Sequence, residues 1–380
     1  MPSATGGCPA GRPNRTFLGM RPLCLVALGA LAAAPCLAAQ DTTGSRTLVP
    51  VPAVFYQPET GLAFGAAVGL FVTPPPRTNG TPLPTSSALA VAIFTTKAQL
   101  LTSLTIELWP RDARRHVIVA LDFQRFPTTY WGLGNDTPDA AEEDYTPVFA
   151  AGALEWTGRT RGALYLGGAI RLRWRNLAKT VAGGLLENPV TPGTGTGLIA
   201  GAGPLVSWDT RDKVSGPHRG ALLQFRADAY ADTPGPGGAF GLTMLDLRGY
   251  VSLAPGQTLA LQAVGRSVWG DAPFDQLAEL GGDALLRGYF QGRFRDRTLV
   301  AVQAEYRGTV IGPLGFAAAA ALGQVAPALR DLTGTGFHAA VGGGLRVLID
   351  RAAGLAIRVD WATATDGSSS GLYFSAGEAF

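Results

Sequence analysis

The chain has 380 residues, a formal net charge of +3 and 16% charged residues, against roughly 25% in ordinary soluble proteins. Hydrophobic residues make up 47% of it and 51 residues are glycine, so a disordered chain is excluded. All of its cysteines, Cys8, Cys24 and Cys36, lie near the N-terminus.

The first element in chain order is an export signal. From Arg21 the sequence RPLCLVALGALAAAPCLAAQ has a basic start, a short apolar run and small residues ending near Ala39, as a secretory signal peptide does. We expect residues 1–39 to be removed, and since Met20 starts the same signal, residues 1–19 fit an over-long start. The alternative is a lipoprotein signal acylated at Cys36, which Pro35 disfavours.

Removal of residues 1–39 changes the charge balance. Three arginines leave with the signal and no acid does, so 28 basic residues face 28 acidic ones and no cysteine remains. A disulfide framework, thiol chemistry and a nucleic-acid partner are therefore not expected. No further apolar stretch reaches the roughly 20 residues of a membrane-spanning helix. Residues 40–51 are expected to form a short periplasmic segment, and residues 52–380 the fold.

The remaining sequence alternates between polar and apolar residues. In 219–231, Gln224, Arg226 and Asp228 are separated by single apolar residues, a period of two that a strand presents as two faces. The same period recurs at 121–124, 171–175, 302–307 and 357–361. A soluble β-sandwich alternates too, but aromatic residues cap the apolar faces, at Trp109, Trp174, Trp269 and Trp361. This arrangement favours a transmembrane β-barrel with rings at both membrane interfaces.

Segments of this kind predict an all-β fold, an antiparallel barrel of about 16 strands. The expected strands are 52–57, 61–72, 85–96, 98–109, 115–124, 145–157, 161–175, 197–209, 219–231, 239–252, 257–269, 297–308, 312–323, 336–348, 354–363 and 370–380. An even count is typical of bacterial outer-membrane barrels. With the first strand running outward, most short connections fall on the periplasmic side and most long ones outside.

One long external connection carries a motif. Residues 271–296 read DAPFDQLAELGGDALLRGYFQGRFRD, and QAEYR follows in the next strand. Together they resemble the signature of the outer-membrane protein assembly superfamily, the BamA and TamA family of bacterial surface antigens. GPLVSWDTRDKVSGPHRG at 203–220, the closing segments from Gly342 and Tyr373, and FPTTYWGLGNDT from Phe126 are also similar to that family. The resemblance covers roughly residues 50–380 and is strongest in the last 180.

The resemblance implies that this loop, with Arg287, Gly288 and Tyr289, folds back into the barrel. Arg287 is then expected to reach a polar patch on the inner wall, where a planar guanidinium can hold the loop in one register. The family places an acid at the position of Ala321, so Glu305 on the preceding strand is the expected substitute partner. The alternative is a solvated loop arginine.

The two ends of the barrel are expected to meet at a seam. The short first strand, with Phe55 and Tyr56, would lie beside a last strand that ends at Phe380 and bends at Gly377. A C-terminal aromatic residue resembles the tag read by the barrel assembly machinery, which is therefore an expected partner for the chain's own insertion, together with outer-membrane lipid.

Enzyme functions are not favoured. The histidines His116, His218 and His338 form no metal-ligand spacing, so no metal, cofactor or catalytic residue is expected. A barrel hydrolase pairing His338 with Ser375 is the enzymatic alternative.

Three functions stay open. The first is a stand-alone family barrel whose seam helps insert or move proteins or lipids, with a separate periplasmic protein in place of the family's polypeptide-transport domains, for which residues 40–51 are too short. The second is a porin-like channel, and the third a surface interaction protein. The porin lumen would be lined by Arg171, Arg173, Arg226, Asp228, Arg358 and Asp360.

Overall fold

The structure is a computed structural model that describes residues 45–75, 83–110, 114–188, 191–214, 216–233, 238–350 and 355–380. The expected signal peptide lies outside the described residues. Within them, no helix is both long and apolar enough to cross a membrane.

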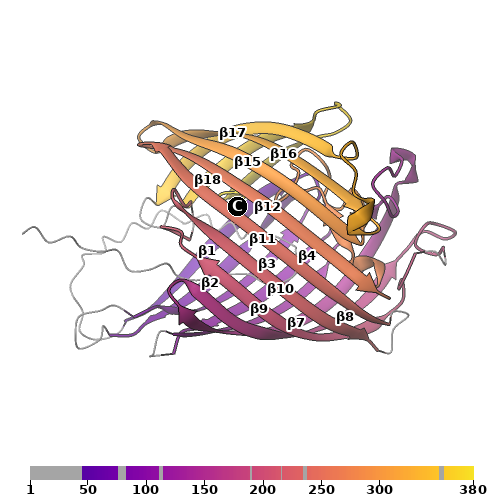
Figure 1. Ribbon diagram of the computed structural model, residues 1–380, viewed down its shortest axis with the longest axis horizontal. Helices are drawn as coiled ribbons and strands as arrows, with labels where there is room; N and C mark the ends of the chain where they lie inside the picture. Colours follow the sequence, from indigo (N-terminus) through magenta and orange to yellow (C-terminus); the bar gives the residue numbers. More distant parts are fainter. Residues whose placement is uncertain are drawn as a thin grey trace, which may run out of the picture.

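One antiparallel sheet closes on itself into a barrel (Figure 1). Seventeen strands join this sheet, and β6 is a three-residue addition paired with β7, so sixteen strands form the wall as predicted. Two more strands, β13 and β14, form a separate hairpin. The strands are β1 Ser45–Gln57, β2 Gly61–Thr73, β3 Ser86–Thr95, β4 Leu100–Leu108, β5 Arg115–Arg125, β6 Thr128–Tyr130, β7 Glu143–Arg161, β8 Leu164–Lys179, β9 Gly197–Asp209, β10 Gly220–Asp232, β11 Ala239–Ala254, β12 Gln257–Gly270, β13 Ala278–Leu280, β14 Phe294–Asp296, β15 Thr298–Ile311, β16 Leu314–Ala326, β17 His338–Asp350, β18 Leu355–Ala364 and β19 Ser370–Ala376. Three short 3-10 helices, η1 Asp139–Ala141, η2 Phe274–Gln276 and η3 Leu329–Asp331, lie between them.

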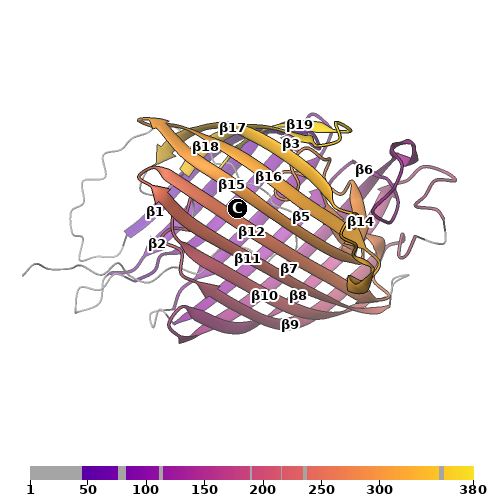
Figure 2. The same cartoon turned by 45° about the horizontal axis from the view of Figure 1, so that its top comes forward.

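Neighbouring wall strands follow one another along the chain, and β1 meets β19 where the sheet closes. The loops that carry β6 and β14 gather at one end of the barrel, on the right of Figure 2. The tight turns between β11 and β12 and between β15 and β16 lie at the other end. This division matches outer-membrane barrels, with long loops outside and short turns in the periplasm.

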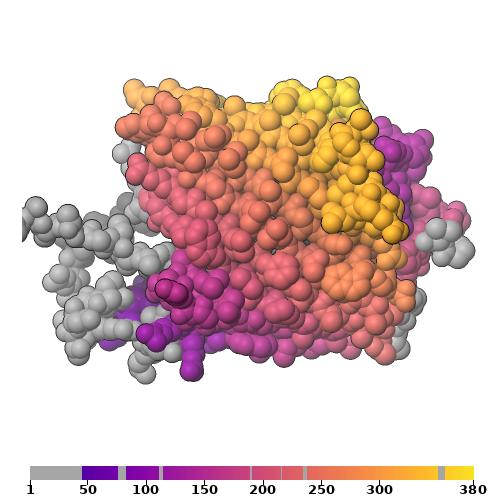
Figure 3. Space-filling model, viewed as in Figure 1, coloured from indigo at the N-terminus to yellow at the C-terminus, as the bar shows by residue number. Residues whose placement is uncertain are grey.

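The two faces of the wall are reversed relative to a soluble protein. Arg226 and Asp228 on β10 face inward and are each 2% exposed. Leu172 and Trp361 face outward and are 51% and 54% exposed. Figure 3 shows the outward side chains as a continuous surface over the C-terminal half of the wall. An apolar outside around a charged inside fits a wall that faces lipid.

Three of the four predicted interface tryptophans, Trp174, Trp269 and Trp361, are exposed on the outside. Trp109 differs, because β4 ends at Leu108 and the strand alternation no longer governs the next residue. Its ring stacks on His116 with 4.1 Å between ring centroids, and its Nε1 donates to Glu107 at 3.2 Å.

The first strand starts earlier than predicted. Residues 45–51 belong to β1 and pair with β2 from Ser45 opposite Thr73 onward, so they are not a separate segment before the wall. This part of β1 contains Pro50 and Pro52, and proline cannot donate a ladder hydrogen bond. They are two residues apart, so both nitrogens lie on the same edge of β1, and an edge strand tolerates proline there.

Candidate functional site

The connection between β12 and β15 folds into the outer half of the barrel as an ordered plug. Its β13–β14 hairpin and its apex pack through Leu280, Leu285, Leu286 and Tyr289 against wall residues such as Val264, Leu299 and Val325. Tyr289 of the expected motif is 3% exposed. Apolar packing therefore holds this loop inside the wall.

The backbone at the apex turns sharply on both sides of Arg287. Leu286 and Gly288 have φ angles of 59° and 108°. A Cβ at Gly288 would lie 2.9 Å from the carbonyl carbon of Thr363, so glycine is required both for its conformation and for this approach to β18. The Gly288 N–H donates to the Tyr373 hydroxyl at 3.0 Å. The turn directs Arg287 at the wall.

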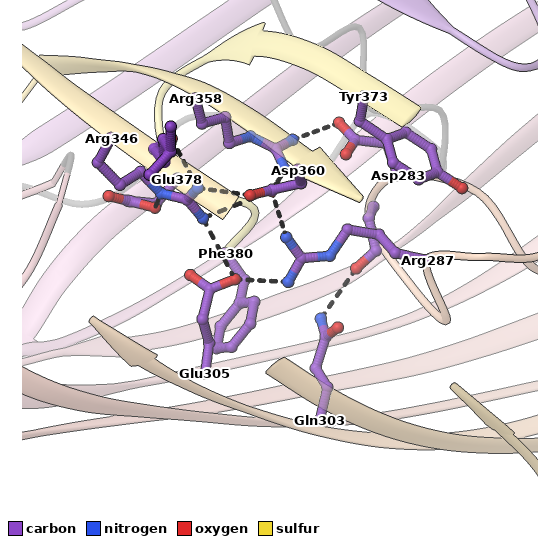
Figure 4. Close-up of polar contacts among 12 residues, drawn as sticks. Asp283, Arg287, Gln303, Glu305, Arg346, Arg358, Asp360, Tyr373, Glu378 and Phe380 are labelled. Carbon is purple, nitrogen blue, oxygen red and sulfur yellow. Dashed lines mark hydrogen bonds and ion pairs between the residues drawn. The ribbon is translucent and has the colours of Figure 1, made fainter. Parts of the chain in front are cut away.

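Arg287 joins two acids from different strands (Figure 4). Its Nη2 lies 2.5 Å from Glu305 Oε2 on β15, and its Nη1 lies 2.6 Å from Asp360 Oδ2 on β18. Arg287 is 6% exposed, so a solvated loop arginine is not what the structure shows. Asp360 was not predicted as a partner of Arg287; the sequence indicated only that it lines the lumen.

Small residues on the two intervening strands make room for this contact. Ala319 on β16 and Gly342 on β17 lie in register between Glu305 and β18, and Gly344 lies opposite Asp360. A Cβ at Gly344 would overlap Asp360 Oδ1 and the Val359 carbonyl. Ala321, where the family has an acid, pairs with Gln303 and carries no charge. The alanine and glycine runs therefore form the floor on which Arg287 lies.

Four arginines and four acids form the cluster around Arg287. Glu305 also binds Arg307 at 2.7 Å, and Asp360 binds Arg346 at 2.5 Å and Arg358 at 2.8 Å. Arg358 reaches Asp283 of the loop, and Arg346 reaches Glu378 at 2.9 Å. The charges balance, and removal of one member leaves a buried charge without compensation.

The C-terminus ends inside the lumen, which corrects the predicted last strand. β19 stops at Ala376, and Gly377, with a φ of 80°, turns the chain away from the wall. The Phe380 ring packs on Tyr250 and Ala260, and the Phe380 backbone oxygen accepts from Arg307 at 3.0 Å. Glu378 and Phe380 lie beyond this turn and contact lumen residues, so the strand period does not apply to them.

The seam joins the wall by a narrow contact. β1 and β19 share a single pair of Cα partners, Tyr56 and Phe374, whereas β1 pairs with β2 over its full length. Tyr56 is 38% exposed on the outside. Phe55 points inward and packs with Phe126 and Ala376. Of the described junctions between wall strands, this one has the fewest paired residues.

A second charged group covers the opposite inner wall. Arg171 on β8 binds Glu155 at 2.5 Å and Asp228 at 2.7 Å. The predicted lumen residues Arg171, Arg173 and Arg226 line a cavity of about 410 Å³ between this group and the loop.

Other external loops close the outer mouth over the plug. In the segment from Phe126 to Thr137, the Gly134 N–H donates to the Arg295 carbonyl at 2.8 Å, and Thr137 accepts from Arg293 at 2.7 Å. Tyr130, Tyr145 and Leu186 pack there with Phe274 and Leu277 of the plug. The family-like loop motif therefore binds the plug directly.

His338 and Ser375, the pair of the enzymatic alternative, do not lie together. Ser375 pairs with Arg358, and Arg358 pairs with Arg346, eight residues along β17 from His338. At about 3.3 Å per residue the two side chains lie far apart. His338 instead contacts the Asn135 carbonyl at 2.9 Å and stacks on Phe294. No group of three or more His, Cys, Asp or Glu side chains that would hold a metal occurs in the described part of the chain.

A closed sixteen-stranded barrel with an apolar exterior, a charged lumen and an external loop folded inside is an outer-membrane β-barrel. The family model described as the Omp85 superfamily domain matches residues 171–380, more than half of the chain, and the chain belongs to that superfamily.

Solved structures have the same fold. The chain is similar to BamA from Haemophilus ducreyi lacking POTRA domains 1–3, with a TM-score of 0.58 and 12% identity over 88% of this chain and 70% of that one. It is also similar to CdiB from Acinetobacter baumannii, at 0.52 and 12% over 88% of this chain, and to CdiB from Escherichia coli, at 0.55 and 9% over 86%. The match spans 60% and 62% of those two CdiB chains. A search of curated protein sequences found no match.

Proposed function

We propose that this barrel assists the insertion or translocation of proteins or lipids at the outer membrane by opening sideways between β1 and β19. The supporting observation is the seam, where one pair of residues, Tyr56 and Phe374, joins the two edge strands. A sheet edge with few partners can accept another strand or let a chain pass toward lipid.

The lumen argues against the porin function. The outer mouth is filled by the Arg287 loop and by the aromatic cluster around Tyr130 and Phe274. The cavity of about 410 Å³ lies beneath this plug. A surface interaction protein would need no charged cluster tying a loop to the inner wall, so the third function is also less favoured.

We propose further that a separate periplasmic protein delivers the substrate to the inner end of the barrel. Co-purification of such a protein from detergent-solubilised membranes tests this partner. The proposal expects its yield to fall when the seam is cross-linked shut, and an unchanged yield would argue against delivery through the seam.

The test of function is depletion of the protein in its native host, followed by quantitative outer-membrane proteomics and lipid analysis. Loss of a defined group of outer-membrane proteins, or a changed lipid composition, is expected before growth slows. Unchanged protein and lipid profiles, together with large and steady ion-selective currents of the purified barrel in planar bilayers, would favour the porin.

A further inference from the structure

The plug loop contacts the first hairpin of the barrel. The Gln291 N–H donates to Glu59 Oε1 at 2.7 Å, and Glu59 lies in the turn between β1 and β2. The Gln57 Nε2, at the end of β1, donates to Asp283 Oδ2 at 3.2 Å. The loop therefore holds the β1 side of the seam through two hydrogen bonds.

The same loop contacts the strands on the other side of the seam. Arg358 on β18 donates to Asp283 Oδ2, the oxygen that Gln57 also contacts. The Tyr373 hydroxyl on β19 accepts from the Gly288 N–H at 3.0 Å. Figure 4 shows Arg358, Asp283 and Tyr373 gathered beside the loop. One carboxylate thus connects the first strand to the last hairpin.

We propose that the Arg287 loop is a clasp across the seam, and that the charge on Glu59 sets how firmly the clasp holds β1. This inference rests on the proposed opening between β1 and β19 and assigns its regulation. It requires the loop to release the β1–β2 turn before the seam opens.

The surroundings of Glu59 disfavour its charged form. Glu59 is 2% exposed, and Asp283 of the loop adds a second negative charge. Lys97 of the β3–β4 turn approaches the same turn, but it donates to the Pro58 carbonyl at 2.6 Å. Tyr373 faces the group from β19. Burial, with a smaller contribution from Asp283, raises the pKa of Glu59 from 4.5 to about 7 and outweighs the hydrogen bond from the Gln291 N–H, which acts in the opposite direction.

The direction of the pH effect follows from this shift. Release of the loop exposes Glu59 to water and moves Asp283 away, which lowers the pKa of Glu59 toward 4.5, so the clasped state binds more protons than the released one. The clasp is strongest below about pH 4.5, weakens as the pH rises to about 7, and changes little above that. Each unit of pKa shift corresponds to about a tenfold change in the clasping equilibrium.

Hydrogen exchange of the mature barrel in lipid nanodiscs tests the clasp. Protection factors, in which the intrinsic pH dependence of exchange is divided out, are measured at pH 5 and pH 8 for peptides covering 54–60, 283–293 and 370–376. In the wild type we expect protection of all three to fall about tenfold or more at pH 8. Glu59→Gln carries no charge at this position, so at both pH 5 and pH 8 we expect it to show the protection that the wild type shows at pH 5.

Two further variants complete the design. Asp283→Asn removes the charge that both sides of the seam contact, and is expected to lower protection of all three peptides at both pH values. Glu187→Gln is the matched control, because Glu187 also accepts from a backbone N–H, that of Gly183 at 2.8 Å, but is exposed in another external loop. It should exchange like the wild type.

Protection that is equal at pH 5 and pH 8 in the wild type, or that falls equally in Glu59→Gln, would overturn the clasp. The proposed function is judged separately, by whether a disulfide across the seam stops activity. If the disulfide stops activity but exchange is the same at pH 5 and pH 8, the seam opens and the clasp is wrong. If the cross-linked barrel keeps its activity and exchange depends on pH as predicted, the loop is a clasp but the barrel does not act by opening at the seam.

Discussion

Arg287 and Asp360 are separated by 73 residues in the chain, and their side chains meet at 2.6 Å in the lumen. The contact joins the apex of an external loop to the middle of β18, and Glu305 completes it from β15. It places the loop, the last strands and the lumen charges in one connected group.

The first prediction concerns this group. Arg287→Ala removes the partner of Glu305 and Asp360, and loss of one side of a buried ion pair costs about 3–5 kcal/mol. The folded barrel migrates faster than the unfolded chain on SDS gels, and the temperature at which it converts to the slower form should therefore fall. Glu305→Ala should lower it too, and the double variant should lose less than the sum of the two.

Arg330→Ala is the control for that series, since the Arg330 side chain is 89% exposed in an external loop. It should leave the transition unchanged. Strictly additive losses in Arg287→Ala and Glu305→Ala would mean that the two side chains do not act as a pair.

The second prediction concerns the glycine opposite Asp360. In Gly344→Ala the new Cβ would overlap Asp360 Oδ1 and a backbone carbonyl, and overpacking of this kind costs about 1–3 kcal/mol. Gly249→Ala on β11 is a matched control because nothing lies within 4 Å of the Cβ it would add. In thermal unfolding of the purified barrels, Gly344→Ala should be less stable than Gly249→Ala. Equal stability of the two variants would contradict a need for small residues beneath Arg287.

Much of the wall was predictable from the sequence because lipid on one side and charges on the other impose a period of two on every strand. Trp109 and the residues after Ala376 were not predictable, since they follow strand ends where that period stops. The start of β1 at Ser45 was not predicted; it includes Pro50 and Pro52, and whether a strand accepts proline depends on which of its edges lacks a neighbour.

The candidate site was only partly predictable. The family resemblance and strand parity pointed to Arg287 and Glu305. The role of Asp360 depends on how β15 to β18 lie in register, which sequence spacing does not specify. The alternation of Arg358 and Asp360 and the glycine opposite Asp360 were the available signals.

The third prediction separates two roles of Phe380. Its ring packs on Tyr250 and Ala260, so Phe380→Ala should lower the unfolding temperature of barrels refolded in detergent, where no assembly machinery acts, by an amount equivalent to about 1–3 kcal/mol. Leu372→Ala, on the outside of β19, is the control. A defect confined to assembly in cells would show that Phe380 serves only as a recognition tag.

The fourth prediction concerns conductance. Replacing residues 282–292 by a short Gly-Ser linker removes the apex that covers the cavity, so single-channel conductance in planar bilayers should rise several-fold above a small wild-type value. Equal conductance of the two proteins would place the barrier to ions elsewhere, for example in the Tyr130 cluster.

The most direct test of seam opening is a disulfide between Tyr56→Cys and Phe374→Cys. These residues are opposite each other in adjacent antiparallel strands, a spacing that a disulfide can bridge, and no cysteine lies in residues 40–380 to compete. In cells depleted of the wild type, the oxidised variant should reproduce the protein or lipid changes of depletion, and a reductant should reverse them, while each single cysteine variant complements fully. Full complementation by the oxidised, cross-linked barrel would contradict an opening between β1 and β19.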